Sequence, residues 1–222
     1  MQQLDLPNGY YELPTGKLAN VVTCFEMEAS PQVVAQALPA GYSLKRVDPR
    51  DLASYRALFR KVGEDLMWFS RLIMPDEKLK AILSHKDVES YALCQGNTAI
   101  GVMELDFRDM PNCELAFFGL AKEAIGAGLG RVLMNTALNK AWAKPINRLW
   151  VHTCHFDHPN AVGFYQRSGF TPYALMVEVH VIPGCKANCQ KQQAPMWPLS
   201  THIVDFFLHR RELILHRLQI IL

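Results

Sequence analysis

The sequence predicts an α/β (α+β) fold in which helices cover both faces of a mixed sheet. From residue 42 onward, strand-like and helix-like segments follow one another in the order βααβββαβαβ. Interleaved strands and helices of this kind are typical of a sheet layered with helices. The chain has 222 residues, of which 50% are apolar and 20% charged, and this ordinary globular composition excludes disorder, collagen and low-complexity repeats.

An N-terminal extension with a strand and a short helix is predicted over residues 1–41. The apolar run over residues 18–27 predicts the strand. Ser30 and Pro31 have the chemistry of an N-cap and a first helical position, so we expect a short helix over residues 31–38.

The main domain is predicted over residues 42–182 and begins with a strand over residues 42–47 and two helices. Asp48 is expected to cap the first helix, because apolar side chains recur at helical spacing over residues 52–62. Pro75 is expected to open the second, shorter helix.

Strands and helices alternate through the rest of this domain. Gly96 and Asn97 lie between two apolar runs and form a two-residue hairpin signal, which predicts two paired strands. Pro145 ends a long helix, and Gly169 stands just past a shorter one. The expected elements are strands over residues 90–95, 98–107, 113–120, 148–154 and 170–182, and helices over residues 128–144 and 159–168.

Residues 183–222 are predicted to form a C-terminal loop followed by an apolar helix over residues 201–222. Apolar residues surround that helix almost completely, so it must pack on the domain, on a second subunit or on a membrane surface. One expected arrangement is a homodimer through this helix or through the N-terminal strand. His202, His209 and His216 each lie two helical turns from the next, so they cannot converge on one metal ion.

Charge and cysteine usage narrow the function classes. The net charge of +2 is too balanced to indicate a nucleic-acid-binding surface, and the sequence contains no run of eighteen apolar residues that would predict a membrane span. The first residues lack the pattern of a secretory signal, and six scattered cysteines suit free thiols in a reducing cytoplasm. Cys185 and Cys189 lie near His180, but without a second pair they predict no metal site.

A glycine-rich turn, Gly126-Ala-Gly-Leu-Gly-Arg131, separates a predicted strand from a predicted helix. Glycine lets successive backbone N–H groups point into one concavity, and the helix N-terminus adds partial positive charge, so the turn suits a pyrophosphate. The dinucleotide fingerprint fails because Arg131 stands where its third glycine would be, and no lysine follows as in a Walker loop. Glycine loops also serve as connectors, so the turn alone leaves binding open.

The turn belongs to a longer pattern. The segments CELAFFGL, GAGLGRVLM, LWVHTC and HPNAVGFYQRSGF follow one another within residues 113–170. This order resembles the acetyl-CoA-binding half of the GCN5-related N-acetyltransferase (GNAT) superfamily, over roughly residues 43–182. The segments WFSR and HTCHFDHP further resemble a bacterial subgroup of unassigned substrate.

The resemblance is carried by two motifs. The family's pyrophosphate motif, Q/R-x-x-G-x-G/A, aligns with Ile125 through Gly130, so Ile125 replaces the polar residue at its first position. Asn160, Tyr165 and the following Gly169-Phe170 match the family's Asn…Tyr-x-x-x-Gly-Phe pattern.

The resemblance implies a mostly antiparallel sheet with a V-shaped splay between two parallel strands, here residues 113–120 and 148–154. Acetyl-CoA, the cosubstrate, is expected to enter this V, with Asn160 holding the pantetheine amide. The residues expected to pair with the pantetheine arm are Phe118, Gly119 and Leu120. Those expected at the pyrophosphate are Gly126, Ala127, Gly128, Leu129, Gly130 and Arg131.

Acyl transfer from a thioester to an amine needs a base, donors for the oxyanion and an acid for the leaving thiolate. Backbone N–H groups of the strand over residues 113–120 are expected to serve the oxyanion. The resemblance places Tyr165 at the family's general acid. Its alternative role is that of a packing aromatic residue on an apolar helix face.

The base is expected among a few side chains. Glu114 and Glu104 are the first candidates, because each lies within or at the start of an apolar strand, where a carboxylate must be paired or face a cleft. His152 and His158 are further candidates. Both carboxylates have an ordinary alternative as salt-bridge partners of nearby arginines.

The acceptor pocket is expected beside Trp68, Phe69 and Arg71, which lie between the two early helices. Arg71 would bind an acceptor carboxylate through its bidentate fork, or it would be a surface charge beside two core aromatic residues. The predicted function is direct transfer of acetyl from acetyl-CoA to a primary amine of a small molecule or protein, in a ternary complex. The alternatives are a non-catalytic acyl-CoA-binding sensor and a structural homo-oligomer that has lost cofactor binding, as Ile125 would favour.

Overall fold

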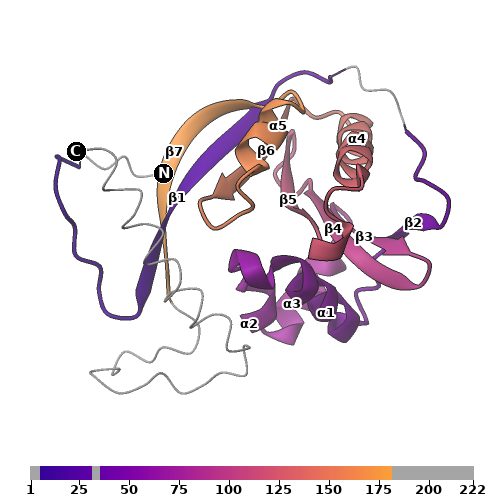
Figure 1. Cartoon of the computed structure of the whole chain (residues 1–222), viewed down its shortest axis with the longest axis horizontal. Helices are drawn as coiled ribbons and strands as arrows, with labels where there is room; N and C mark the ends of the chain where they lie inside the picture. Colours follow the sequence, from indigo (N-terminus) through magenta and orange to yellow (C-terminus); the bar gives the residue numbers. More distant parts are fainter. Residues whose placement is uncertain (1–5, 32–35, 182–222) are drawn as a thin grey trace. The chain divides into compact units, whose positions relative to one another are not determined.

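The computed structural model describes residues 6–31 and 36–181 (Figure 1). The chain divides into two compact units, one over residues 19–178 and one that combines the two chain ends. Half of the short helix predicted over residues 31–38 lies outside the described residues, and the described half, residues 31 and 36–38, is not helical. The loop and apolar helix predicted over residues 183–222 also lie outside the described residues.

Within the described residues, seven strands form one sheet in the order β2-β3-β4-β5-β6-β1-β7. The pairs β2–β3, β3–β4, β4–β5 and β1–β6 are antiparallel, whereas β5–β6 is parallel. The mixed, mostly antiparallel sheet is therefore confirmed. The strands are β1 (Lys17–Met27), β2 (Tyr42–Arg46), β3 (Val88–Gln95), β4 (Thr98–Asp106), β5 (Asn112–Leu120), β6 (Arg148–Cys154) and β7 (Thr171–Val181).

The first helix begins one turn later than the sequence predicts. Asp51, not Asp48, is its N-cap, because the Asp51 carboxylate accepts the backbone N–H of Ser54 at 3.0 Å. Asp48 instead accepts the backbone N–H of Arg50 at 2.9 Å, in the turn before the helix. The helices are α1 (Leu52–Gly63), α2 (Ser70–Ile73), α3 (Asp76–Leu83), α4 (Leu129–Trp142) and α5 (Ala161–Gln166). None of the helices in the described part combines the length and apolar character that a membrane crossing requires.

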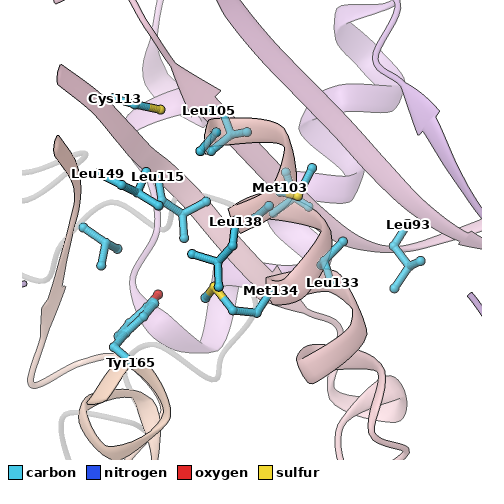
Figure 2. Close-up of a cluster of buried hydrophobic side chains, with 14 of the residues drawn as sticks. Leu93, Met103, Leu105, Cys113, Leu115, Leu133, Met134, Leu138, Leu149 and Tyr165 are labelled. Atoms are coloured by element: carbon cyan, nitrogen blue, oxygen red, sulfur yellow. The ribbon is translucent and has the colours of Figure 1, made fainter. Parts of the chain in front are cut away.

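Helices cover both faces of the sheet, as predicted (Figure 1). Neighbouring side chains of β4 show this, because successive residues of a strand point to opposite faces. Met103 and Leu105 are fully buried in the cluster that contains Leu138 of α4 (Figure 2), whereas Glu104 lies against Tyr55 of α1. Each fully buried large apolar side chain of this cluster contributes about 1.5–3 kcal/mol to folding.

The parallel strands β5 and β6 part after a short stretch of pairing. Their register runs only from Asn112 opposite Arg148 to Glu114 opposite Trp150. Beyond that point β5 continues to Leu120 and β6 to Cys154 without pairing to each other. The V-shaped splay is therefore present, and its apex lies at Glu114.

A register shift in β5 orients the side chains beside the apex. Glu104 lies opposite Phe117 and the next residue of β4 lies opposite Leu115, so Ala116 has no partner on β4. Directly opposed residues of an antiparallel pair point to the same face. Because Asp106 is opposite Glu114, all of Glu104, Asp106, Glu114 and Phe117 point to the α1 face of the sheet.

Strand β1 occupies an interior position of the sheet. Val22 through Met27 pair with Cys154 through Leu149 of β6, and β7 lies on the other side of β1. Along Val22 through Met27 both edges of β1 are therefore occupied, and the homodimer expected through the N-terminal strand stays a prediction.

Candidate active site

Glu104 is part of a fully buried ionic cluster. Its side chain is inaccessible to solvent, and its carboxylate accepts hydrogen bonds from the hydroxyl of Tyr55 at 3.2 Å and from Nη2 of Arg71. An ionised carboxylate survives in such a place only because a charge and donors compensate its lost hydration. The arrangement fits the alternative role of Glu104, as an ion-pair partner.

Arg71 is buried rather than on the surface, with only 7% of its side chain exposed. Its guanidinium lies over the ring of Phe117, 5.0 Å from the centroid, in addition to the bond to Glu104. The buried Nε atom has no hydrogen-bond partner among the described residues. The charge of Arg71 is therefore paired inside the protein with Glu104, while its Nε–H keeps an unused donor.

Glu114 differs from Glu104 because, among the described residues, no arginine or lysine lies within salt-bridge distance of its carboxylate. Its side chain is 26% exposed, and its Oε1 lies 3.7 Å from Nδ1 of His152. Burial first, and then the nearby charges of Asp106 and Glu104, raise the pKa of Glu114 from its ordinary 4.5 to about 7, against a smaller lowering by Arg71 and Arg108. A carboxyl group that titrates near neutral pH can take and release a proton under ordinary conditions, as a general base requires.

His152 and His158, the other candidates for a base, lie in different settings. The His152 ring stacks beside Trp150 on β6, with centroids 6.0 Å apart. His158 is exposed in the turn before α5, where its Nδ1 accepts the backbone N–H of Asn160 at 3.2 Å. His158 therefore has the contacts of a turn residue, whereas His152 lies beside Glu114.

The glycine-rich turn leads directly into α4. Gly126 and Gly128 have φ angles of +92° and +76°, in the left-handed region that side chains disfavour. A Cβ built on either residue would meet nothing within 4 Å, so the turn borders open space. The first turn of α4 carries no acidic side chain, and its N-cap, Gly128, supplies no side-chain bond. These features leave the helix N-terminus open to an anion, while Ile125 adds an exposed apolar side chain.

The remaining expected cofactor residues lie around the same end of β5. Phe118 stacks on Phe164 of α5, with ring centroids 5.8 Å apart. Arg131 contacts α5 through its guanidinium, which lies over the Phe164 ring 5.0 Å from the centroid, and its Nη1 donates to Oγ of Ser168, just after the helix, at 2.9 Å. Asn160 is exposed at the N-cap of α5.

Tyr165 is buried on the face of the sheet opposite Glu114. Its ring packs near Phe25 and Phe170, each 5.9 Å away between centroids. Figure 2 shows its hydroxyl directed into the cluster that contains Leu115, just beyond the apex of the V. Burial raises the pKa of Tyr165, and the charge of Asp157 raises it further, so the phenol keeps its proton.

Trp68 lies in the turn between α1 and α2. Its ring packs against Phe59 and Phe117, with centroids 5.7 and 5.5 Å apart. Its indole Nε1 donates to Oδ1 of Asp157 at 2.9 Å. Phe69 follows at the N-cap of α2. These aromatic residues line the α1 face beside the splay.

A model of the Acetyltransferase (GNAT) family matches residues 55–170, more than half of the chain. The chain belongs to this family. The matched range contains the splay, the glycine-rich turn and Tyr165. No curated protein is similar enough in sequence to count as a relative.

Solved structures agree with this GNAT fold. A GCN5-related N-acetyltransferase from Kribbella flavida has 16% identity and a TM-score of 0.51, over 77% of this chain and 61% of its own. One from Sphaerobacter thermophilus has 12% identity and a TM-score of 0.52, over 74% and 52%. A tandem GNAT protein from the clavulanic acid biosynthesis pathway has 15% identity and a TM-score of 0.53, over 82% and 62%. The chain thus covers between 52% and 62% of these proteins, and at such identities the likeness shows the fold alone.

Sequence reasoning missed two residues of this GNAT site. Asp157 joins Trp68 to the end of β6, and Tyr55 donates to Glu104. Tyr55 appeared only as an apolar position of α1, and no local pattern marks an aspartate whose partners come from distant segments. Within residues 6–31 and 36–181, no group of three or more His, Cys, Asp or Glu side chains is arranged to hold a metal ion, while Cys185 and Cys189 lie outside these ranges.

Proposed function

We propose that the protein is an N-acetyltransferase that moves acetyl from acetyl-CoA to a primary amine of a small molecule or peptide, by direct attack in a ternary complex. One observation carries the proposal. The strands β5 and β6 part at Glu114, which points to one face of the sheet, while Tyr165 lies on the other face. A base and an acid thus flank the place where a thioester would lie.

Backbone groups would form most of the acetyl-CoA binding site. Past Glu114, the β5 edge that faces β6 has no strand partner, so its polar groups are available to the pantetheine arm at Phe118 through Leu120. The pyrophosphate would bind at Gly126 through Arg131, where the turn borders open space at the N-terminus of α4. Asn160 would bond the pantetheine amide.

The chemistry needs one proton at each end. Glu114 would take the proton of the attacking ammonium, directly or through water, so that the nitrogen lone pair forms the new C–N bond. The C–S bond then breaks, Tyr165 would donate its proton to the leaving thiolate, and the nitrogen would lose its second proton through water, which reprotonates Tyr165. General acid–base assistance of this kind is typically worth about 10²–10⁴-fold in rate.

The acceptor side favours a cationic amine. Of the three carboxylates on the α1 face, Glu104 and Asp106 are buried and paired with Arg71 and Arg108, so the partly exposed Glu114 is the one available to an ammonium. The aromatic rings of Trp68 and Phe69 would form one wall of the acceptor pocket, and such a wall suits an ammonium next to an apolar group. Since the cysteines of the described part are free thiols, we also propose that the enzyme works in the cytoplasm.

The proposal is tested first by titrating acetyl-CoA into the full-length protein by calorimetry, with adenosine diphosphate as control. Loss of thioester absorbance is then followed with lysine ethyl ester, spermidine, kanamycin and a lysine-containing peptide. We expect acetyl-CoA to bind and at least one amine to be acetylated, with kcat lowered by about 100-fold or more in Glu114→Gln or Tyr165→Phe. Binding without any acetylation would favour the acyl-CoA sensor, and absence of binding would refute both functions.

A further inference from the structure

We propose that Asp157 is a positioning residue for acyl transfer, because it fixes the Trp68 indole across the open end of the V. The role rests on the proposed acetyltransferase function. It concerns how the two arms of the splay are held apart, and neither residue needs to touch the reacting atoms.

The Asp157 carboxylate joins two distant parts of the chain. Its Oδ2 accepts hydrogen bonds from Oγ1 of Thr153 at 2.6 Å and from the backbone N–H of Cys154 at 3.0 Å. Its Oδ1 accepts the indole N–H of Trp68 at 2.9 Å. Two donors therefore belong to the end of β6, and the third comes from the turn after α1. Bonds to an ionised acceptor are about twice as strong as neutral ones, so one carboxylate holds both parts together.

The same indole also touches the other arm of the V. A Cβ built on Gly119 would lie 3.2 Å from Cη2 of Trp68, and the ring of Phe117 lies 5.5 Å from that of Trp68. Gly119 lies on the part of β5 that has left β6. Trp68 therefore contacts β5 through its six-membered ring and the segment after β6 through its N–H, and it sets the separation of the two arms on the acceptor face.

The backbone turn before Trp68 positions this side chain. Met67 has φ +60° and is the single non-glycine residue with positive φ among those described, a conformation that costs about 1–2 kcal/mol. At Gly63, a Cβ would lie 2.4 Å from Cβ of Trp68, so only glycine fits. The backbone N–H of Trp68 donates to the carbonyl of Gly63 at 2.9 Å. A strained turn with a required glycine indicates a position that the surrounding structure enforces.

The charge of Asp157 acts on the acid as well. It raises the pKa of Tyr165, second to the effect of burial. Asp157, which bonds the Trp68 indole, therefore also helps to keep the phenol of Tyr165 protonated on the opposite face of the sheet.

The test uses the full-length protein with Trp68→Phe, Asp157→Asn and the double variant. Phenylalanine keeps an aromatic ring without the N–H, and asparagine keeps the shape without the charge. The matched control for the indole is Trp142→Phe, because Nε1 of Trp142 is buried without a partner among the described residues. The control for the charge is Asp109→Asn, an exposed carboxylate that bonds Asn112. Readouts are kcat and KM for the best amine of the panel above, the Kd of acetyl-CoA, and the urea midpoint.

We expect each single variant to lose about 10- to 100-fold in kcat, the loss that misplacement by about 1 Å brings. The acetyl-CoA Kd should change little, because the pyrophosphate seat lies at α4, whereas the urea midpoint of each single variant should fall, because charge-assisted hydrogen bonds are lost. The double variant should be no worse than the poorer single one, since both remove the same contact. The two controls should keep the wild-type kcat.

Three outcomes would overturn the role. Variants that keep wild-type kcat in an active enzyme would show that the contact positions nothing. Parallel losses of kcat, acetyl-CoA affinity and the urea midpoint would make the contact purely structural. A wild type that binds acetyl-CoA but acetylates no amine of the panel would refute the proposed function itself, and the positioning role would fall with it.

Discussion

Replacing Glu114 by glutamine is expected to stabilise the folded protein at alkaline pH. Burial first, and then the nearby charges of Asp106 and Glu104, raise the pKa of Glu114 from its ordinary 4.5 to about 7. Between these two values the folded state binds more protons than the unfolded state, so the free energy of unfolding falls as the pH rises. Glutamine has the same shape and no charge, so the variant does not lose this free energy of unfolding as the pH rises.

The size of the effect follows from the shift. The difference between about 7 and 4.5 is about 2.5 pKa units, and at about 1.36 kcal/mol per unit it amounts to roughly 3 kcal/mol. Below about pH 4 the wild-type carboxyl is protonated in both states, so wild type and Glu114→Gln should be about equally stable. Above about pH 8 the variant should be more stable by about 3 kcal/mol.

Urea unfolding, followed by tryptophan fluorescence from about pH 4 to about pH 9, measures this difference directly. Because other groups titrate alike in both proteins, their effects cancel when the two are compared at each pH. Glu28→Gln, at an exposed site after β1, is the control and should show no pH-dependent gain. A stability gain at the acidic end equal to that at the alkaline end, or a loss at the alkaline end, would refute the reasoning. Glu114 would then be ionised without penalty and unsuited to act as the base.

Three further substitutions test other parts of the structure. Arg71→Met leaves the buried Glu104 without its cation, so the free energy of unfolding in urea should fall by about 3–5 kcal/mol. Adding Glu104→Gln should restore stability, and an unchanged urea midpoint in Arg71→Met would contradict the ion pair. Gly119→Ala places a Cβ 2.7 Å from Cγ1 of Val62, so calorimetric melting should reveal a loss of about 1–3 kcal/mol, and an unaltered melting temperature would argue against this packing. Asp51→Ala should cost about 1 kcal/mol in urea unfolding by removing the cap of α1, and a loss no larger than that of the control Asp48→Ala would speak against the assignment.

The glycine turn was accessible to sequence reasoning because its signals are local, whereas the splay was expected only from the family resemblance. Gly126 and Gly128 stand where the backbone needs positive φ, and the helix that follows has its own apolar pattern. The cap of α1 shows the limit of such signals. Asp48 and Asp51 are both suitable carboxylates, and only the distance from an oxygen to a helical N–H decides between them.

Long-range partners account for what the sequence left open. Glu104 meets Arg71 and Tyr55, which lie 33 and 49 positions away along the chain, so no spacing rule distinguishes a paired carboxylate from a free one. Glu114 and Asp157 raise the same difficulty. Their contrasting roles depend on burial and on donors from other elements, which only the folded chain brings together.

The interior position of β1 has a consequence for synthesis on the ribosome. Met27 is made early, but its partner Leu149 follows 122 residues later, as 149 minus 27 gives. At about 5–20 residues per second, roughly 6–25 s pass before the partner strand exists. During that time the apolar side of β1 has no sheet to join, and an unpaired apolar strand of this kind is prone to aggregation. An N-terminal truncation that reaches Met27 would accordingly remove an inner strand of the sheet and separate β7 from β6.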